Sequence, residues 1–372
     1  MAERFSLKDH LFNAQTVGQL AGEYADALPA FDAERFTKEA LSGFGSRELM
    51  ARLEWLADCI EAQLSNDFNE MATELEVAMP RQLDPNLQDD DFGQFIHAVP
   101  GILAVRHGLE AHRTRAMKLL YAATQRFSME FYIRPFLNRW PEETLSVLQE
   151  WANDANYHVR RLVSEGTRPK LPWAKAVQLT PDQTLPLLDK LHADHTRYVT
   201  RSVANHLNDL SKTVPHRVLE RLDHWDKAGA QNDKELAWIT RHALRTLVKA
   251  GDAGALAALG YSADVPVEAA VSLLEPVPTI GGALNFEVTI TASEALPVLV
   301  DYRIVFARPD GRFAEKVFKL KQSKASPDQP LRLSKKHPIK SDATTFTWHP
   351  GAHRLIVQVN GVDRAELTFH LT

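Results

Sequence analysis

Cysteine is almost absent from this chain of 372 residues, in which Cys59 stands alone. A single cysteine excludes an intrachain disulfide and a zinc site built from cysteines. This composition is typical of a reducing compartment, and we expect a cytoplasmic protein of the bacterial cytosol. Long apolar runs are absent too, since no stretch approaches the roughly 18 apolar residues of a membrane span. The charged opening, MAERFSLKDHLF, is unlike a signal peptide.

Two further features are missing from the pattern. His192 and His195 are three residues apart, but no third ligand follows at a spacing typical of a metal site. We therefore expect no metal and no other cofactor. A large net charge is also missing, because 43 Lys and Arg stand against 48 Asp and Glu. A net charge of −5 excludes a protein that coats nucleic acid in bulk.

The charges that are present are distributed unevenly. Residues 1–95 contain 7 Lys and Arg against 19 Asp and Glu, whereas residues 96–250 contain 23 against 16. The remaining residues contain 13 of each kind. A mildly acidic protein with a basic middle is typical of one localised anion-binding face.

The basic middle contains a repeat with a period of forty residues. The segment DANYHVRRLVSEGTR from Asp154 is echoed by DHTRYVTRSVANHLND from Asp194. This period is typical of stacked two-helix repeats of HEAT type. Prolines at 141, 181 and 215 mark helix starts, and we expect return helices near 156–165, 196–210 and 234–249. The sequence therefore predicts a mainly α fold, with a HEAT-like α–α superhelix over residues 1–263.

The repeat register places Arg161, Arg201 and Arg241 at equivalent positions. Each repeat of such an array presents the same helix to its concave face, so these side chains would form a ladder. Such a ladder suits the regularly spaced phosphates of duplex DNA. In the alternative interpretation, each arginine pairs with an acidic side chain and braces neighbouring repeats.

After Pro266 the pattern changes to that of strands. Apolar residues alternate over 284–290 and 298–306, and Asn360-Gly361 is a strong hairpin signal. About seven short strands over residues 266–372, without a cysteine pair, predict a small all-β immunoglobulin-like sandwich. Within it, residues 316–340 contain eight Lys and Arg against Asp328 alone. The cluster is either a DNA contact or a solvated strand edge guarded by lysines.

Several motifs together resemble the HEAT-like repeat alkylpurine DNA glycosylases, in the AlkC branch that has a C-terminal immunoglobulin-like domain. They are FSLKDHLFN, RLEWLADC, FSMEFYIRPF, NYHVRRLVSEGTRPKLPW and SVANHLNDLSK. The resemblance implies a monofunctional DNA repair glycosylase acting on N3-alkylated bases, 3-methyladenine and 3-methylcytosine, in duplex DNA. It also implies that the base is not flipped into a pocket, unlike the usual pattern. The implied partner is double-stranded DNA carrying alkylated bases, and we expect a monomer that binds no membrane.

A base methylated at N3 is cationic and leaves readily, so its excision needs carboxylates that stabilise a positively charged sugar and position a water. Glu130 lies in the aromatic segment FSMEFYIRPF, and Glu165 follows Arg161 by four residues on one predicted helical face. Asp209 is the third candidate. The alternatives are a helical ion pair of Glu165 with Arg161 and, for Glu130, a solvated residue or a buried structural pair.

The remaining candidates are DNA contacts. Trp173 closes the proline-stiffened segment TRPKLPW, in which Arg168 and Lys170 flank the first proline; a core role for this tryptophan is the alternative. The full set of predicted DNA-binding residues is Arg161, Arg168, Lys170, Trp173, Arg201, Asn205, Arg241, His242, Arg245, Lys316, Lys319, Lys321, Lys335 and Lys336.

Two other functions compete with a glycosylase. One is a non-catalytic HEAT-repeat adaptor for an acidic protein, and the other is a DNA-structure-binding protein without activity. An adaptor for an acidic partner gains nothing from carboxylates on a basic face, so Glu130 and Glu165 favour catalysis.

Overall fold

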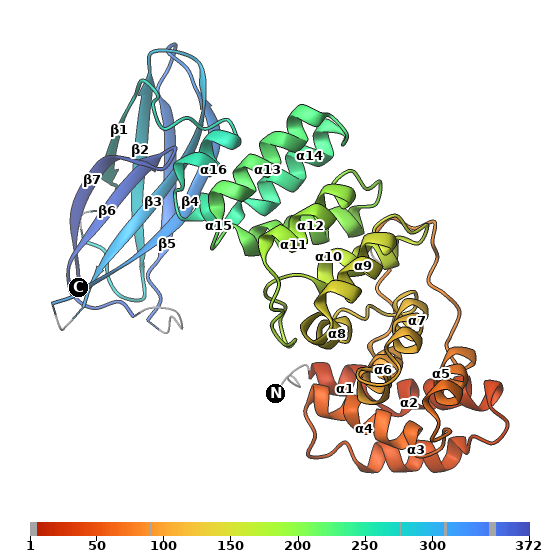
Figure 1. The fold of residues 1–372 in the computed structure, drawn as a ribbon. Coiled ribbons are helices and arrows are strands. Elements are labelled where there is room, and N and C mark those ends of the chain that lie inside the picture. The colour runs from red at the N-terminus through yellow and green to blue at the C-terminus, as the bar shows by residue number, and fades with distance from the viewer. Residues whose placement is uncertain (1–5, 90, 276, 309–310, 342–346) are drawn as a thin grey trace. The chain divides into compact units, whose positions relative to one another are not determined.

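The computed structural model describes residues 6–372, apart from 90, 276, 309–310 and 342–346 (Figure 1). The chain divides into two compact units. Unit 1 comprises Met1–Leu210 and Trp225–Ile239, and unit 2 comprises Ser211–His224 and Thr240–Thr372. Helices precede strands throughout, which confirms the predicted class of a helical array followed by a small β-sandwich. No helix in the described part of the chain is long and apolar enough to cross a membrane.

The helices follow one another with mostly short connections, and the longer loops follow α5 and α10. Their bounds are α1 Leu7–Leu11, α2 Ala14–Ala27, α3 Ala33–Ser42, α4 Leu49–Glu61, α5 Phe68–Val77, the 3₁₀ helix η1 Phe95–Ala98, α6 Val99–Gly108, α7 Arg113–Thr124, α8 Ile133–Arg139, α9 Pro141–Trp151, α10 Tyr157–Gly166, α11 Pro181–Leu191, α12 Arg197–Leu210, α13 Pro215–Ala228, α14 Asp233–Ala243, α15 Arg245–Lys249 and α16 Ala253–Ala258.

Proline sets the starts of the repeat helices. Helices α9, α11 and α13 begin at Pro141, Pro181 and Pro215, as predicted, because the missing N–H of proline is not needed in a first turn. The return helices α10 and α12 are also confirmed within two residues. The expected single helix over 234–249 was wrong, since Leu244 adopts φ −90° and ψ 1° and separates α14 from α15.

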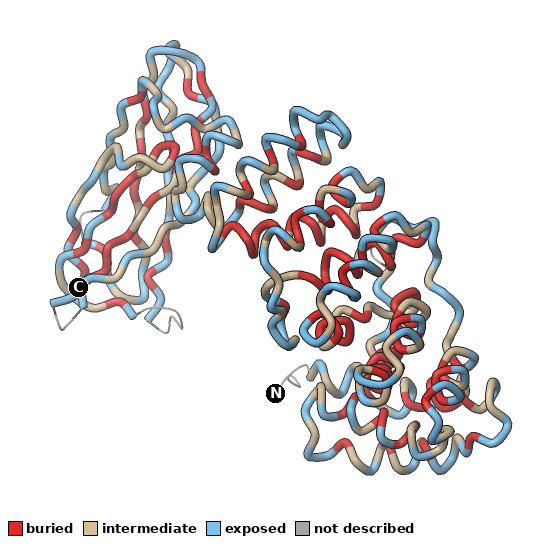
Figure 2. Tube along the Cα trace, in the orientation of Figure 1, coloured by how far each residue is buried: buried red, intermediate tan, exposed pale blue. Residues whose placement is uncertain are grey.

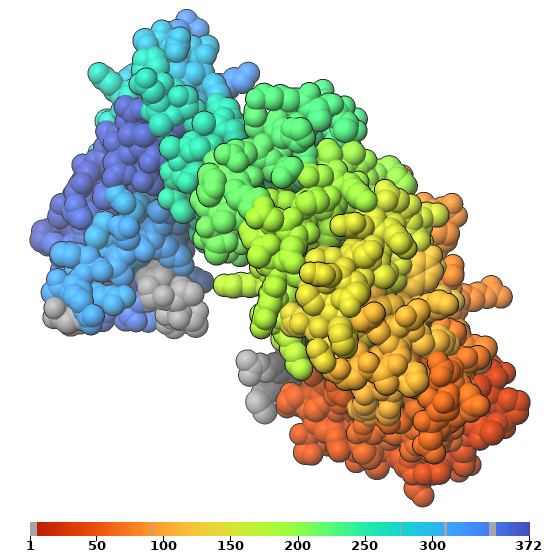
Figure 3. Space-filling view, viewed as in Figure 1, coloured from red at the N-terminus to blue at the C-terminus, as the bar shows by residue number. Residues whose placement is uncertain are grey.

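Unit 1 is built by successive stacking of neighbouring helices. Helix α10 packs against α12, and α11 contacts both. In the space-filling view the colour passes gradually from red to yellow-green along this unit, so segments that follow one another in sequence are neighbours in space (Figure 3). The apolar faces of these helices form the core, seen as red stretches in Figure 2. Such an arrangement presents successive repeats to a ligand in register.

Unit 2 contains two antiparallel sheets. The strands are β1 Val267–Leu273, β2 Ala283–Ala292, β3 Leu296–Ala307, β4 Phe313–Ala325, β5 Leu331–Pro338, β6 Gly351–Val359 and β7 Val362–Leu371. One sheet has the order β1-β2-β5, and the other has the order β4-β3-β6-β7. The predicted hairpin is confirmed, because Asn360 and Gly361 between β6 and β7 have φ of 51° and 79°, which a two-residue hairpin turn requires.

The alternating positions of β2 and β3 face the sandwich core. Phe286 and Tyr302 lie at its centre and are almost completely buried. The basic segment 316–340 lies on the two edge strands that adjoin each other, β4 and β5. Lys316, Lys319 and Lys321 are on β4, whereas Lys335 and Lys336 are on β5. Lysines on exposed edges prevent edge-to-edge pairing, so this position agrees with both interpretations of the cluster.

Candidate active site

Helix α10 carries Arg161 and Glu165, two of the side chains that gather in unit 1. Asn156 caps its N-terminus, where the side chain accepts a hydrogen bond from the His158 backbone at 2.9 Å. The helix ends at Gly166, where a Cβ atom would lie 2.5 Å from Ile133 Cγ2 of α8. Glycine therefore permits the close approach of α8 to the end of α10, and this contact fixes the segment that follows.

Glu165 lies in the last turn of α10 and is only 4% exposed. Its Oε1 accepts a hydrogen bond from Arg168 Nη1 at 2.5 Å and lies 3.5 Å from Arg161 Nη2. Its Oε2 accepts a hydrogen bond from Ser202 Oγ of α12 at 2.6 Å. The predicted helical pair of Arg161 and Glu165 therefore exists, but it is one contact among several.

Glu130 lies in the turn before α8 and is more accessible, with 17% of its side chain exposed. Its Oε2 accepts hydrogen bonds from Ser128 Oγ, at 2.8 Å, and from Arg161. The Arg161 guanidinium lies between Glu130 and Glu165, and it also stacks 4.8 Å above the ring of Tyr198. Arg161 therefore joins two of the three predicted catalytic carboxylates.

Asp209, near the end of α12, completes the cluster. Arg168 donates to Asp209 Oδ2 from Nε at 3.0 Å and from Nη2 at 2.9 Å, while it also pairs with Glu165. Three carboxylates and two guanidinium groups therefore alternate in one buried network. We call it the carboxylate–arginine network, and its members in order are Glu130, Arg161, Glu165, Arg168 and Asp209.

The electrostatics of the network keep its central members charged. Burial on its own raises the pKa of the Glu165 carboxyl, but the charges of Arg161 and Arg168, with a hydrogen bond from Ser202, hold that pKa below its usual range. Burial likewise opposes the charge of Arg161, but the Glu130 and Glu165 carboxylates raise the Arg161 pKa above its usual value. Glu165 and Arg161 are therefore ionised at neutral pH.

Arg134 supports the network from α8 without an ion pair. Its guanidinium is fully buried and donates to three backbone carbonyls, those of Lys175 at 2.5 Å, Gly166 at 3.0 Å and Arg168 at 2.9 Å. Burial and the nearby charge of Arg168 lower its pKa to about 10. These hydrogen bonds hold the loop after α10, in which Trp173 is 69% exposed and has a φ of 64°. An exposed tryptophan on a braced loop fits a contact residue and argues against the core role.

The ladder residues differ in their surroundings. Arg201 of α12 forms an ion pair with Asp89 and lies 5.9 Å from the ring of Phe92. Both partners belong to the acidic loop that follows α5, whose Gln88 carbonyl accepts a hydrogen bond from the Tyr198 backbone at 3.0 Å. Asn205, one turn further along α12, is half-buried. Arg161 and Arg201 are therefore both engaged with carboxylates in unit 1.

The third ladder residue lies in unit 2, beside other predicted DNA contacts. Arg241 and Arg245 are exposed and, with Lys319 of β4, line a groove of about 330 Å³. Its floor includes Leu299 and the carboxyl of Asp301, whose pKa burial raises to about 6. His242 is half-buried, and its carbonyl accepts a hydrogen bond from Arg245. The groove therefore collects cations from α14, α15 and β4.

Sequence reasoning missed several residues of unit 1. Ser202 and Arg134 touch the network or its loop, and neither has a sequence signal of its own. Arg160, the neighbour of the ladder residue Arg161, pairs with Asp194 at 2.5 Å across repeats. Arg160 therefore braces neighbouring repeats alongside the pairs Arg161–Glu130 and Arg168–Asp209, and the recurrence of Asp154 at Asp194 is the only sequence signal that could have pointed to it.

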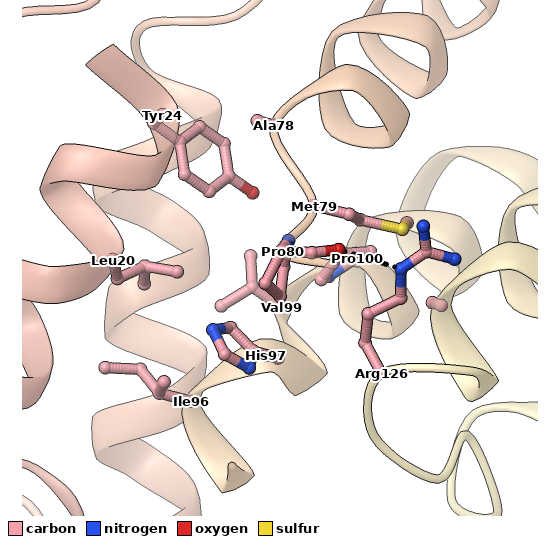
Figure 4. A pocket seen from close by; sticks show the side chains of 11 residues that line it. Leu20, Tyr24, Ala78, Met79, Pro80, Ile96, His97, Val99, Pro100 and Arg126 are labelled. Carbon is pink, nitrogen blue, oxygen red and sulfur yellow. Dashed lines mark hydrogen bonds between the residues drawn. The ribbon is translucent and has the colours of Figure 1, made fainter. Parts of the chain in front are cut away.

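The cavity in Figure 4 lies apart from these residues. Figure 4 shows a cavity with room for about one water (about 10 Å³), lined by Leu20, Tyr24, His97 and Arg126 among others. Arg126 donates to the Pro80 carbonyl at 3.0 Å beside it. None of the predicted site residues lines this cavity. Among the residues that the structure describes, no three His, Cys, Asp or Glu side chains are grouped as metal ligands. Lys170 is exposed in the loop that Arg134 braces.

Known proteins match this chain over nearly its full length. A family described as "Uncharacterised protein YhaZ, C-terminal Ig-like domain" matches residues 268–372. The uncharacterised protein YhaZ of Bacillus subtilis (strain 168) is 32% identical over 370 residues, which cover 97% of this chain and 98% of YhaZ. The alkylpurine DNA glycosylase AlkC of Pseudomonas fluorescens, solved bound to DNA containing an abasic site analog, is 33% identical. Its structure aligns with a TM-score of 0.82 over 99% of this chain and 100% of AlkC.

Identity above 30% across nearly the full length of both relatives, together with the match of the C-terminal strands, shows the family. The chain belongs to the family of AlkC and YhaZ, in its form with a C-terminal immunoglobulin-like domain.

Proposed function

We propose that this protein is a monofunctional DNA repair glycosylase that hydrolyses the N-glycosidic bond of N3-alkylated bases in duplex DNA. The observation that supports this most directly is the carboxylate–arginine network, in which the three predicted catalytic carboxylates of unit 1 meet. The resemblance to AlkC, whose structure contains DNA with an abasic site analog, supports the same class of substrate. The proposed bases are 3-methyladenine and 3-methylcytosine. In this proposal the enzyme excises them without flipping the base into a pocket.

The proposed chemistry needs little acid catalysis. A base alkylated at N3 carries a positive charge, so it leaves as a neutral base when the bond to C1′ of the sugar breaks. The sugar then carries positive charge, which buried carboxylates stabilise more strongly than water does. A water adds to C1′ and gives its proton to a carboxylate, which leaves an abasic sugar and the free base.

Glu130 is the carboxylate best placed to meet water and sugar. Both of its hydrogen bonds are made by Oε2, and its side chain is the most accessible of the three carboxylates. Glu165 is 4% exposed, and both of its oxygens are engaged. In this proposal Glu130 accepts the proton, while Glu165 and Asp209 hold the arginines and add negative potential behind it.

The predicted DNA contacts would surround this point. Trp173 and Lys170 belong to the braced loop beside the network, whereas the predicted contact Arg168 is paired with Glu165 and Asp209 within it; Arg201 lies on the same helix as Asp209. Arginine and lysine bind backbone phosphates with little dependence on sequence. A glycosylase needs such contacts because it must find a lesion in any sequence. The groove cations and edge lysines of unit 2 are proposed as further contacts.

The decisive experiment is release of free methylated base from a duplex that contains a single 3-methyladenine or 3-methylcytosine. Purified protein in excess should release the base faster than the uncatalysed reaction and leave an abasic site with no strand break. The Glu130→Gln variant should bind the duplex but release the base slowly. Glu142→Gln is the matched control, because Glu142 is an exposed carboxylate on α9 outside the network.

The outcomes separate the competing functions. Binding to the duplex without release of either base would contradict the proposal and favour a DNA-structure-binding protein. Neither binding nor release would favour an adaptor. A normal rate in Glu130→Gln would leave the glycosylase in place but remove Glu130 from its chemistry.

A further inference from the structure

Glu165 is contacted across the repeat boundary by a buried hydroxyl. Ser202 of α12 is 2% exposed, and its Oγ donates to Glu165 Oε2 at 2.6 Å. The same Oγ lies 3.0 Å from Oγ of Ser164, which is fully buried on α10. A hydroxyl has one proton, so if Ser202 donates to the carboxylate, Ser164 must donate to Ser202. The two serines therefore form a directed chain that ends on Glu165.

The forty-residue register shows that this hydroxyl is not a requirement of the repeat. Ser202 corresponds to Leu162 of the preceding repeat, which is fully buried. Leucine is the ordinary choice at an apolar position of a helix interface, and a buried hydroxyl there costs free energy unless it is hydrogen-bonded. Serine at this position therefore has a specific partner, the carboxylate of the adjacent helix.

Charged groups face Glu165 from several elements. Arg161 and Arg168 contact its Oε1, and Glu130, Asp209 and the Arg134 guanidinium lie in the same cluster. His206 of α12 lies next to Ser164, since its Nδ1 is 3.1 Å from the Ser164 carbonyl. Burial lowers the pKa of His206 to about 4, so this ring is neutral near pH 7. The arginines approach Oε1, whereas Ser202 is the neutral donor that holds Oε2.

We propose that Ser202, oriented by Ser164, is a positioning residue that fixes the orientation of the Glu165 carboxylate and, through Arg161, the orientation of Glu130. The proposal rests on the proposed glycosylase function. Without the hydroxyl, Oε2 has no donor, and the carboxylate can rotate between its two arginines. Because Arg161 bridges Glu165 and Glu130, that rotation changes the position of the carboxylate that meets the substrate. A displaced catalytic carboxylate lowers the rate of the chemical step without lowering the affinity for the substrate.

The test is single-turnover base release by Ser202→Ala, with Ser202→Thr as the conservative variant. Losing a hydrogen bond to a charged group should slow release about tenfold or more, with unchanged affinity for the duplex. Threonine keeps the hydroxyl and should restore most of the rate. Ser164→Ala should have a smaller effect of the same sign. Thr144→Val is the matched control, because Thr144 has a buried hydroxyl that donates to the Phe136 carbonyl, outside the network.

A double-mutant cycle with Glu165→Gln distinguishes positioning from general packing. If Ser202 acts through the Glu165 carboxylate, Ser202→Ala should barely change the rate of base release in the Glu165→Gln background. The ratio of the two rates should then approach one. An equal effect in both backgrounds, or a wild-type rate in Ser202→Ala, would overturn the proposal. The acid limb of the pH–rate profile gives an independent readout. Loss of a donor to the ionised carboxylate raises the carboxyl pKa, so the limb should move to higher pH in Ser202→Ala. A slow Ser202→Ala variant whose acid limb does not move would also contradict the proposal.

Failure of the proposed function is distinguishable from failure of this inference. If the wild-type protein releases no base, the glycosylase itself is wrong and the cycle cannot be measured by rates. In that case the Glu165 pKa in Ser202→Ala, measured by NMR titration, still tests the contact. An unchanged pKa would overturn the positioning role.

Discussion

At the scale of single residues, the proposed function requires the charge of Glu165 more than its shape. Glu165→Gln keeps the size of the side chain but removes the negative charge between Arg161 and Arg168. We expect base release to slow about 100- to 1,000-fold, since removing one preorganised electrostatic group has effects of that size. Affinity for the duplex should change little. Loss of binding together with activity, measured by fluorescence anisotropy, would assign Glu165 a structural role instead.

The buried histidines make stability depend on pH. Burial lowers the pKa of His206 to about 4, whereas an exposed histidine has a pKa near 6.5. Between about pH 6.5 and 4, His206 is therefore protonated in the unfolded chain but neutral in the folded chain. The free energy of unfolding should fall by up to about 1.4 kcal/mol per pH unit from this group as the pH decreases through that window, and no loss is expected above it. Urea unfolding at pH 7.5 and pH 5 measures the difference.

His206→Gln is the variant that isolates this contribution. Its unfolding free energy should depend less steeply on pH than that of the wild-type protein. Some slope remains, because His158 also has a pKa lowered to about 4 by burial. Equal slopes in the two proteins would show that His206 takes up its proton in the folded state.

Sequence spacing identified individual residues of the site but not their connections. The four-residue spacing of Arg161 and Glu165 predicted a contact that the structure contains at 3.5 Å. The pairing of Arg168 with Asp209 depends on how α10 and α12 pack, and no local pattern carries that information. For the same reason Ser202 was not predicted, because its partner lies 37 residues away in the sequence.

At the scale of elements, the acidic loop after α5 would compete with DNA for Arg201 of the proposed ladder. Asp89 pairs with Arg201, and Phe92 lies beside the same guanidinium. A phosphate can pair fully with the Arg201 guanidinium only when the ion pair between Asp89 and Arg201 breaks. Asp89→Asn should therefore raise the affinity for duplex DNA up to about fivefold, the value of a partly exposed ion pair. A filter-binding titration at fixed salt measures it, and weaker binding would show that the loop supports the DNA face.

The ladder arginines should differ in what their removal costs. Arg201→Ala and Arg241→Ala should each weaken DNA binding and reduce the salt slope by about one unit if the residue contacts a phosphate. Arg161→Ala should lower the melting temperature more, because it removes the ion pair of Glu130 and one of the two arginines beside the buried Glu165 carboxylate. Lys38→Ala is the control, since Lys38 is exposed on α3, outside the predicted contacts. Equal salt slopes in all four variants would mean that the ladder does not contact phosphates.

Helix starts were predictable because proline acts locally. Pro141, Pro181 and Pro215 begin α9, α11 and α13 whatever surrounds them. The break at Leu244 was not predictable in the same way, because leucine favours helix and its side chain is fully buried there. Tertiary packing decides that conformation. The hairpin at Asn360-Gly361 was predictable because both residues tolerate positive φ.

At the scale of the whole molecule, the hydrophobic pattern of the sequence and the compact units of the structure place the division of the chain at different residues. The change from helical to strand patterns predicted a boundary at residues 263–266, which remains a prediction. Unit 2, however, includes Thr240–Ala258 with the strands. Within that unit Asn360 Nδ2 donates to the Ser262 carbonyl at 2.8 Å, and Arg364 donates to the Ala263 carbonyl at 2.9 Å. Hydrophobic periodicity reports the type of an element, but not which core the element joins.

This arrangement gives a definite prediction for a chain that ends at Ala263. Such a chain keeps every helix of unit 1 but loses the strands that cover α15 and α16. Leu256 of α16 is 1% exposed and lies close to Gly361 of the last hairpin, so removing the strands exposes it. We expect helices α2–α12 to stay protected in hydrogen exchange, while amides of residues 245–258 exchange faster. Base release should fall strongly, because the groove of Arg241, Arg245 and Lys319 loses its sheet side. Unchanged protection over 245–258 together with full base release would reduce the sandwich to an accessory.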